Sequence, residues 1–137
     1  MTTTLDYRDN EPLSVPEPAL ALLSQAEQGL AEAELDPEPA ERFALAYLAA
    51  LRAAAALLAL RGRPHRGTSR PTSVWTLLVS VAPELHEWAA FFASWSTTRA
   101  SVQAGITRVV TPRSADDLVR QAGQFLGLVT RAIHGPS

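Results

Sequence analysis

The sequence predicts an all-α protein, an up-and-down bundle of four main helices in a single domain. In four segments, apolar residues recur at spacings of three and four, the period of a helix with one buried face. Proline, glycine, serine and threonine stand at the borders of these segments, where they act as helix start and stop signals. No segment alternates apolar and polar residues as a half-buried strand does, and the only short β-branched candidate is 106–111. Short connections between the segments favour antiparallel neighbours.

The first helix is expected to begin near residues 16–18 and to end at Asp36 and Pro37. Its apolar stripe consists of Leu20, Leu23, Ala26, Leu30 and Ala33. Residues 1–16 are polar and interrupted by prolines. We therefore expect a flexible N-terminal tail over 1–16 and the helical bundle over 17–134.

The second helix should begin at residues 37–39, since proline is tolerated in a first turn, and should run to about Arg61. Its apolar face consists of Phe43, Tyr47, Leu51, Ala54 and Leu58, and many of its other positions are alanine, which lets a neighbouring helix come close. Residues 43–60 approach the length of a membrane span, but Arg52 lies at their middle. A central arginine costs about 2.5 to 3.5 kcal/mol on insertion scales, so we expect a buried bundle helix and no membrane partner.

A third helix is expected over 74–105, with Thr72 or Ser73 as its N-cap. Pro83 removes a backbone donor and clashes with the preceding turn, so either a kink or a new helix start is expected at 82–83. The core-facing stripe should be Trp75, Leu78, Ala82, Leu85, Ala89 and Phe92.

The fourth helix has two candidate caps. Thr111 can cap it with Pro112 in the first turn, or Ser114 can cap it with Asp117 three residues later. The helix should end at residues 135–136, and its stripe is Leu118, Ala122, Phe125, Leu126, Val129 and Ile133.

Length and composition limit the possible functions. A chain of 137 residues suits one domain. There is no cysteine, which excludes disulfides, thiolate metal sites and a cysteine nucleophile. The N-terminal segment lacks the features of a secretory signal, so a cytoplasmic location is expected. The three histidines, His65, His86 and His134, have no partner at metal-ligand spacing, and we expect no metal and no cofactor.

Charge is unevenly distributed, although the net charge is only −2. Residues 1–41 contain ten acidic residues and one arginine, whereas residues 42–83 contain six arginines and no acidic residue. This region includes the stretch LRGRPHRGTSRPTSVW, residues 60–75, with Arg61, Arg63, His65, Arg66 and Arg70. Guanidinium groups match phosphate oxygens in two-point contacts, so the stretch could grip RNA, with Trp75 stacked on a base. The other interpretation is a solvated connection between two helices, with Trp75 in the core.

The third helix is aromatic on a second side, where Trp88, Phe91 and Trp95 lie. Three interpretations stay open: burial at the centre of the bundle, a ligand pocket, or contact with another protomer. Because four helices leave little room for a fully central one, we expect these residues to form a homodimer face. A protein partner could also meet this face or the acidic first helix.

Three segments carry a resemblance to a known family: AERFALAYLAALRAAAALLALRGRP, RPTSVWTLLVSVAPELHEWAAFFA and TPRSADDLVRQAGQFLGLV. Over residues 18–133 the chain resembles a small stand-alone actinobacterial family of the HEPN superfamily, the higher-eukaryote and prokaryote nucleotide-binding domain. The resemblance implies a helical bundle, frequent dimerisation and roles around RNA. Some members are metal-independent ribonucleases of toxin–antitoxin and defence systems.

The active ribonucleases of that superfamily carry an arginine followed, after four to six residues, by a histidine. Arg108 and Arg113 stand near the start of the last helix, but neither has a histidine at that spacing. Without an imidazole beside the arginine there is no evident general acid or base. We therefore expect a non-catalytic, RNA-associated or regulatory module, with a divergent ribonuclease using Arg108 or Arg113 and a pure protein-interaction module as alternatives.

Overall fold

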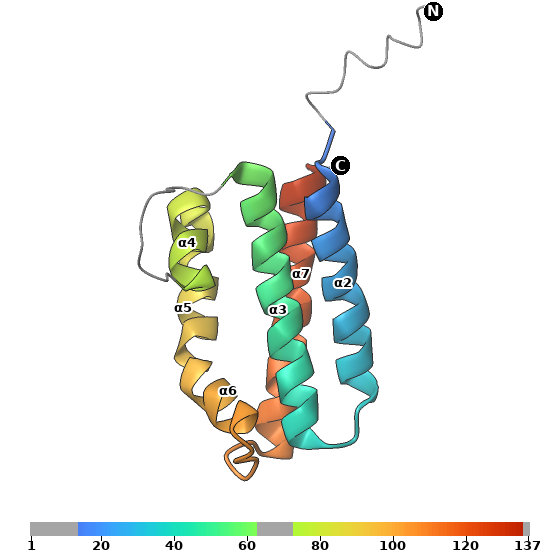
Figure 1. Cartoon of the computed structure of the whole chain (residues 1–137), viewed down its shortest axis with the longest axis vertical. Coiled ribbons are helices and arrows are strands. Elements are labelled where there is room, and N and C mark those ends of the chain that lie inside the picture. Colours follow the sequence, from blue (N-terminus) through green and yellow to red (C-terminus); the bar gives the residue numbers. More distant parts are fainter. Residues whose placement is uncertain (1–13, 63–72, 136–137) are drawn as a thin grey trace, which may run out of the picture.

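The computed structural model describes residues 14–62 and 73–135, and within these ranges all regular structure is helical (Figure 1). The all-α class is thus confirmed. The elements are α2 (Glu17–Leu35), α3 (Pro39–Arg61), α4 (Val74–Val81), the short 3-10 turn η2 (Pro83–Leu85), α5 (His86–Ser94), α6 (Ser96–Gln103) and α7 (Pro112–His134). The expected tail lies mostly outside the described residues.

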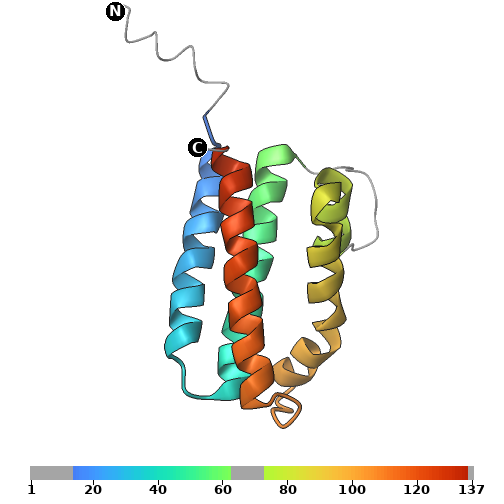
Figure 2. The ribbon, with the colours of Figure 1, turned by 180° about the vertical axis from the view of Figure 1, so that it is seen from behind.

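The helices lie side by side with α3 at the centre. Helix α3 packs closely against α2 and α7 and also contacts α4 and α6. Helix α2 runs antiparallel to both α3 and α7, which run in the same direction, and α5 with α6 forms a fourth column that descends on the other side of α3 (Figures 1 and 2). The N-terminal end of α2 and the C-terminal end of α7 lie at the same end of the molecule (Figure 1).

The segment 74–103 is not a single kinked helix: of the two alternatives expected at 82–83, a kink or a new helix start, the structure has the new helix start. Trp75 at the start of α4 stacks on Phe92 near the end of α5, with ring centroids 5.0 Å apart. Positions 17 residues apart in one helix would be separated by about 25 Å. At Ala82 the backbone leaves the helical region with φ −141° and ψ 68°. Pro83 then starts η2, and α5 runs back along α4 as the second arm of a helical hairpin.

Side-chain caps fix the starts of α4 and α7. Ser73 caps α4, since its Oγ accepts from the Thr76 amide at 3.2 Å. Thr111 caps α7 in a reciprocal arrangement: its Oγ1 accepts from the Ser114 amide at 2.9 Å, and the Ser114 Oγ accepts from the Thr111 amide at 3.0 Å. These three bonds satisfy backbone donors at the helix starts, and they decide between the caps that the sequence left open.

Most of the predicted stripes form the core. The whole stripe predicted for the last helix is buried, and so is the one predicted from Trp75 to Phe92. In α2 the prediction was partly wrong, because Leu20 is 37% exposed and Ala19 is fully buried in its place. In α3 Leu51 is only half-buried, whereas Phe43, Tyr47, Ala54 and Leu58 are buried as expected.

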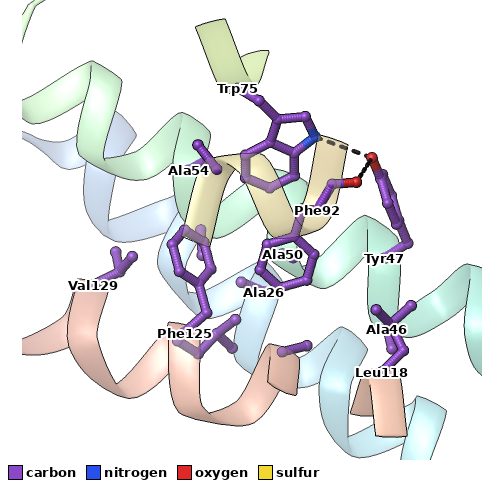
Figure 3. Packing of buried hydrophobic residues seen from close by; sticks show 14 of the residues in the cluster. Ala26, Ala46, Tyr47, Ala50, Ala54, Trp75, Phe92, Leu118, Phe125 and Val129 are labelled. Atoms are coloured by element: carbon purple, nitrogen blue, oxygen red, sulfur yellow. Dashed lines mark hydrogen bonds between the residues drawn. The ribbon is translucent and has the colours of Figure 1, made fainter. Parts of the chain in front are cut away.

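Two kinds of packing meet at α3. Most buried residues of α3 are alanine, including Ala46, Ala50 and Ala53, and Ala49 of α3 lies against Gly29 of α2. The side chains around the α4–α5 hairpin are instead aromatic. The Phe92 ring contacts Trp75, Trp88 and Phe125 at centroid distances of 5.0 to 6.3 Å. The Tyr47 hydroxyl accepts from Trp75 Nε1 at 3.0 Å and donates to the Phe92 carbonyl at 2.9 Å (Figure 3).

Arg42 joins the opposite end of α3 to its neighbours. Its Nη1 donates to the Asp36 carbonyl at 2.8 Å, in the connection from α2. Its Nε lies 3.0 Å from Asp116 Oδ1 of α7, a close ion pair without the alignment of a hydrogen bond. The starts of α3 and α7 are therefore neighbours at one end of the bundle.

Helix α3 is long and apolar enough to cross a membrane by length and composition, with a mean hydropathy of 2.0 over its most apolar window. Within the bundle 56% of that window is buried, as in the core helix of a soluble protein.

Candidate nucleic-acid interface

Residues 60–75 are called the basic stretch from here on. Arg61, its first arginine, lies at the C-terminal end of α3. The helix ends at Gly62, whose φ of 87° lies in the left-handed region that favours glycine. The Arg61 Nη1 donates to the Val81 carbonyl at 3.1 Å and to Glu84 Oε2 at 2.9 Å. These bonds link the end of α3 to the corner of the α4–α5 hairpin.

The Arg61–Glu84 pair lies at the surface. Their side chains are 31% and 55% exposed. The hydrogen bond from Arg61 holds the pKa of the Glu84 carboxyl below its usual value, so this carboxyl is ionised at neutral pH. An exposed pair of this kind contributes little to stability because water and salt screen it. A phosphate could therefore compete with Glu84 for the guanidinium at small cost.

The other predicted members of the basic stretch, Arg63, His65, Arg66 and Arg70, lie outside the described residues. The structure places the two ends of the stretch. It leaves α3 after Gly62 beside the hairpin corner, and it enters α4 at Ser73, the N-cap of that helix.

A groove of about 410 Å³ borders the point where the basic stretch enters α4. It is lined by Tyr47 and Leu51 of α3, by Ser73, Val74 and Trp75, and by Ser96, Arg99, Ala100 and Gln103 of the α6 segment. The walls are largely apolar, and Arg99 is the charged residue that lines them.

Arg99 was not predicted as a site residue. Its guanidinium carbon lies 5.2 Å from the centroid of the Tyr47 ring, within the range of a cation–π contact. Within the described part of the chain, Arg99 makes no side-chain hydrogen bond and has no carboxylate within 4.0 Å. Its donors thus stay available to an anion in the groove. No sequence signal could have found it, since its position depends on how α6 packs on α3.

Trp75 belongs to the core. Its side chain is only 5% exposed, its indole N–H is bonded to Tyr47, and its ring is stacked on Phe92. The interpretation of Trp75 as an anchor at the helix start is therefore confirmed, and the ring offers no free face for a stacked base.

Arg108 and Arg113 lie at the far end of the bundle from Arg61. Arg113 is in the first turn of α7, where its side chain is 90% exposed and its Nε is 3.8 Å from Asp117. Helix α7 has His134 at its other end, about 31 Å away at the rise of an α-helix.

The second described histidine is equally remote from these arginines. His86 Nδ1 lies 3.1 Å from the Pro83 carbonyl, which accepts its hydrogen bond in the hairpin corner, beside Arg61. His65 lies outside the described residues. Neither described histidine can therefore act with Arg108 or Arg113, which removes the main support for the ribonuclease alternative in this part of the chain.

The predicted dimer residues Trp88, Phe91 and Trp95 are all half-buried. The Trp88 ring packs on Phe125 at a centroid distance of 5.8 Å, and Trp95 meets Phe43 edge-on at 5.6 Å. These tryptophans thus contribute to the core of their own chain. What stays open to solvent is a groove of about 270 Å³ lined by Glu87, Trp88, Phe91 and Gln121.

No group of three or more histidine, aspartate or glutamate side chains gathers as metal ligands within residues 14–62 and 73–135.

A family model describes most of this bundle. The SAV_6107-like HEPN model matches residues 33–130. The chain belongs to this HEPN family. The match runs from the end of α2 to the last turns of α7 and includes the whole segment between Arg61 and Ser73. Searches of curated proteins and of solved structures gave no match.

Proposed function

We propose that this HEPN protein is a cytoplasmic, non-catalytic module that binds RNA through the basic stretch between α3 and α4, in a regulatory role such as those of toxin–antitoxin or defence systems. The observation that carries the proposal is the density of charge in that stretch. Arg61, Arg63, Arg66 and Arg70 fall within ten residues that contain no acidic residue. Such a segment attracts the phosphates of a nucleic acid and releases their counterions.

The surroundings of the stretch support binding rather than neutralisation within the fold. The acidic residue that meets it in the described structure is Glu84, in an exposed pair with Arg61. At the other end of the stretch, Arg99 adds a guanidinium without a carboxylate partner among the described residues. Phosphate contacts of this kind position an RNA strand without reading its sequence, so we expect weak base preference.

The test is a titration of the protein into end-labelled single-stranded RNA at several salt concentrations. The variant Arg66→Ala/Arg70→Ala removes two charges from the basic stretch. Arg108→Ala/Arg113→Ala removes two exposed charges at the opposite end and is the matched control. Each lost phosphate contact should lower the slope of log affinity against log salt by about 0.7. We expect that change in the first variant and an unchanged slope in the control.

A denaturing gel of the same samples tests the enzymatic alternative. RNA that is shifted and intact supports a binding module. Cleavage that persists in EDTA, follows the protein through purification and disappears in Arg108→Ala/Arg113→Ala would instead establish a metal-independent nuclease. Equal RNA affinity for wild type and Arg66→Ala/Arg70→Ala would refute the assignment of the basic stretch.

A further inference from the structure

One face of α3 carries a repeating pattern that the bundle covers only in part. Glu41, Leu45, Leu48, Arg52, Ala55 and Ala59, here called the α3 stripe, follow one another at spacings of four, three, four, three and four. Residues at this spacing lie on one side of a helix, and it is the spacing of the contact positions of a coiled coil.

The α3 stripe lies on the outer side of the central helix. Glu41 is exposed and the other five residues are half-buried, whereas the buried residues of α3 alternate with them. Seen in Figure 1, α3 lies in front of α7, with α2 on one side and α4 to α6 on the other, and none of the elements within residues 14–62 and 73–135 covers its front. The view from behind shows α7 on the opposite side of α3 (Figure 2). An apolar helix thus keeps one face open.

Two charges interrupt the stripe, and neither is compensated by the described structure. Between Phe43 and Leu60, Arg52 is the only charged residue. Within residues 14–62 and 73–135, no opposite charge lies within 4.0 Å of Arg52 or Glu41. The two residues are 11 positions apart, which corresponds to about three turns and 16 Å along the same face.

We propose that the α3 stripe is the contact surface for a second copy of this chain, with the two α3 helices antiparallel. In a parallel pair, Arg52 would meet Arg52 of the partner subunit and Glu41 would meet its own equivalent, so like charges would face each other. In the antiparallel pair, a two-fold axis between positions 46 and 47 brings Glu41 of each copy to Arg52 of the partner subunit. The same axis places Leu45 opposite Leu48 of the partner subunit, twice, as an isologous interface requires.

This surface differs from the predicted aromatic dimer face. Trp88 and Trp95 pack against Phe125 and Phe43 of their own chain, so that face is in large part already used. The α3 stripe has apolar residues between two opposite charges, and such a pattern specifies both a partner and an orientation. It is also separate from the basic stretch, so this inference does not depend on RNA binding.

The experiment measures the dimer dissociation constant of the full chain by sedimentation equilibrium for wild type, Glu41→Arg, Arg52→Glu and the double variant. Each single variant places like charges opposite each other at both symmetric contacts, and we expect it to weaken the dimer at least about tenfold. The double variant exchanges the charges and should restore the wild-type constant to within about threefold. Glu87→Arg, an exposed charge reversal beside Trp88, is the matched control and should leave the constant unchanged.

Thermal melting by circular dichroism checks that each variant is folded. Because Glu41 is exposed, Glu41→Arg tests the interface even if Arg52→Glu unfolds the helix. A wild-type chain that stays monomeric, single variants with unchanged dimerisation, or a double variant as weak as the singles would each overturn the proposal. Loss of the dimer in Glu87→Arg, with the α3 variants unaffected, would assign dimerisation to the aromatic face instead.

Discussion

The two sides of α3 are packed by opposite means. Toward α2, small residues lie against small residues; for example, a Cβ at Gly29 of α2 would lie 3.9 Å from the Ala49 Cβ of α3. Toward the α4–α5 hairpin, the space is filled by rings, with Trp75, Phe92 and Phe125 in mutual contact. Alanine brings helix backbones close and leaves few gaps, whereas rings hold helices apart.

The two sides of α3 also differ in the grooves that they border. Three grooves, of about 270, 200 and 410 Å³, all border α4, α5 or α6, on the aromatic side. The basic stretch also enters the fold there, at Ser73. The alanine side instead supplies the close contact between α2 and α3.

The largest effect is expected on the aromatic side, from Phe92→Ala. Phe92 is fully buried and contacts five other rings, so truncation leaves a cavity among these rings. The free energy of unfolding should fall by about 3 to 5 kcal/mol, as measured by urea denaturation. Phe91→Ala, on the same helix but half-buried, should cost clearly less. Equal losses would mean that the hairpin is not held by this cluster.

On the alanine side, stability should be lost when side-chain volume is added rather than removed. Ala53 is fully buried in α3, and Ala53→Leu adds three carbon atoms where two helices meet closely. Overpacking of this kind should lower the free energy of unfolding by about 2 to 3 kcal/mol. Ala31→Leu, at an exposed position of α2, is the control and should change stability by less than about 0.5 kcal/mol. A neutral Ala53→Leu would show that the alanine contact is loose.

How far the sequence could predict this structure differs between the two sides. Helix periodicity predicted the three long helices α2, α3 and α7, and most residues of their stripes are buried, with Leu20 of α2 as the clear exception. It did not decide the course of residues 74–103, where the stripe from Trp75 to Phe92 keeps its period across Pro83. Both arms of the hairpin present that stripe to one core, so periodicity alone cannot distinguish a hairpin from a kinked helix.

The candidate site was predictable only where it depends on local charge. The density of arginine in residues 60–75 is visible in the sequence, and Arg61 indeed lies at the end of α3. The role of Glu84 as its partner and the position of Arg99 over Tyr47 depend on contacts across 23 and 52 residues of chain. Such contacts arise from packing and leave no pattern in the sequence.

The smallest effect is expected where the two sides meet, at the Tyr47 hydroxyl. This group links Trp75 of the hairpin to α3 and to the Phe92 carbonyl. Tyr47→Phe keeps the ring but leaves the buried Trp75 N–H without its acceptor, which should cost about 1 to 2 kcal/mol. Phe92→Ala should cost more than this even though both variants disturb the same cluster, because one removes a hydrogen bond and the other removes volume.

The same residue predicts a dependence on pH. Burial raises the pKa of the Tyr47 phenol above its ordinary value of 10.0, against opposing effects of the Trp75 hydrogen bond and the Arg99 charge. The folded state therefore holds this proton more tightly than the unfolded state does. The resulting stability is fully present below pH 10 and is lost as pH rises through the folded pKa. Urea denaturation at pH 8 and above pH 10 should show a decline in wild type that is smaller in Tyr47→Phe. An identical decline in both proteins would mean that the hydroxyl is exposed to water and that the hydrogen bonds between hairpin and α3 do not persist in solution.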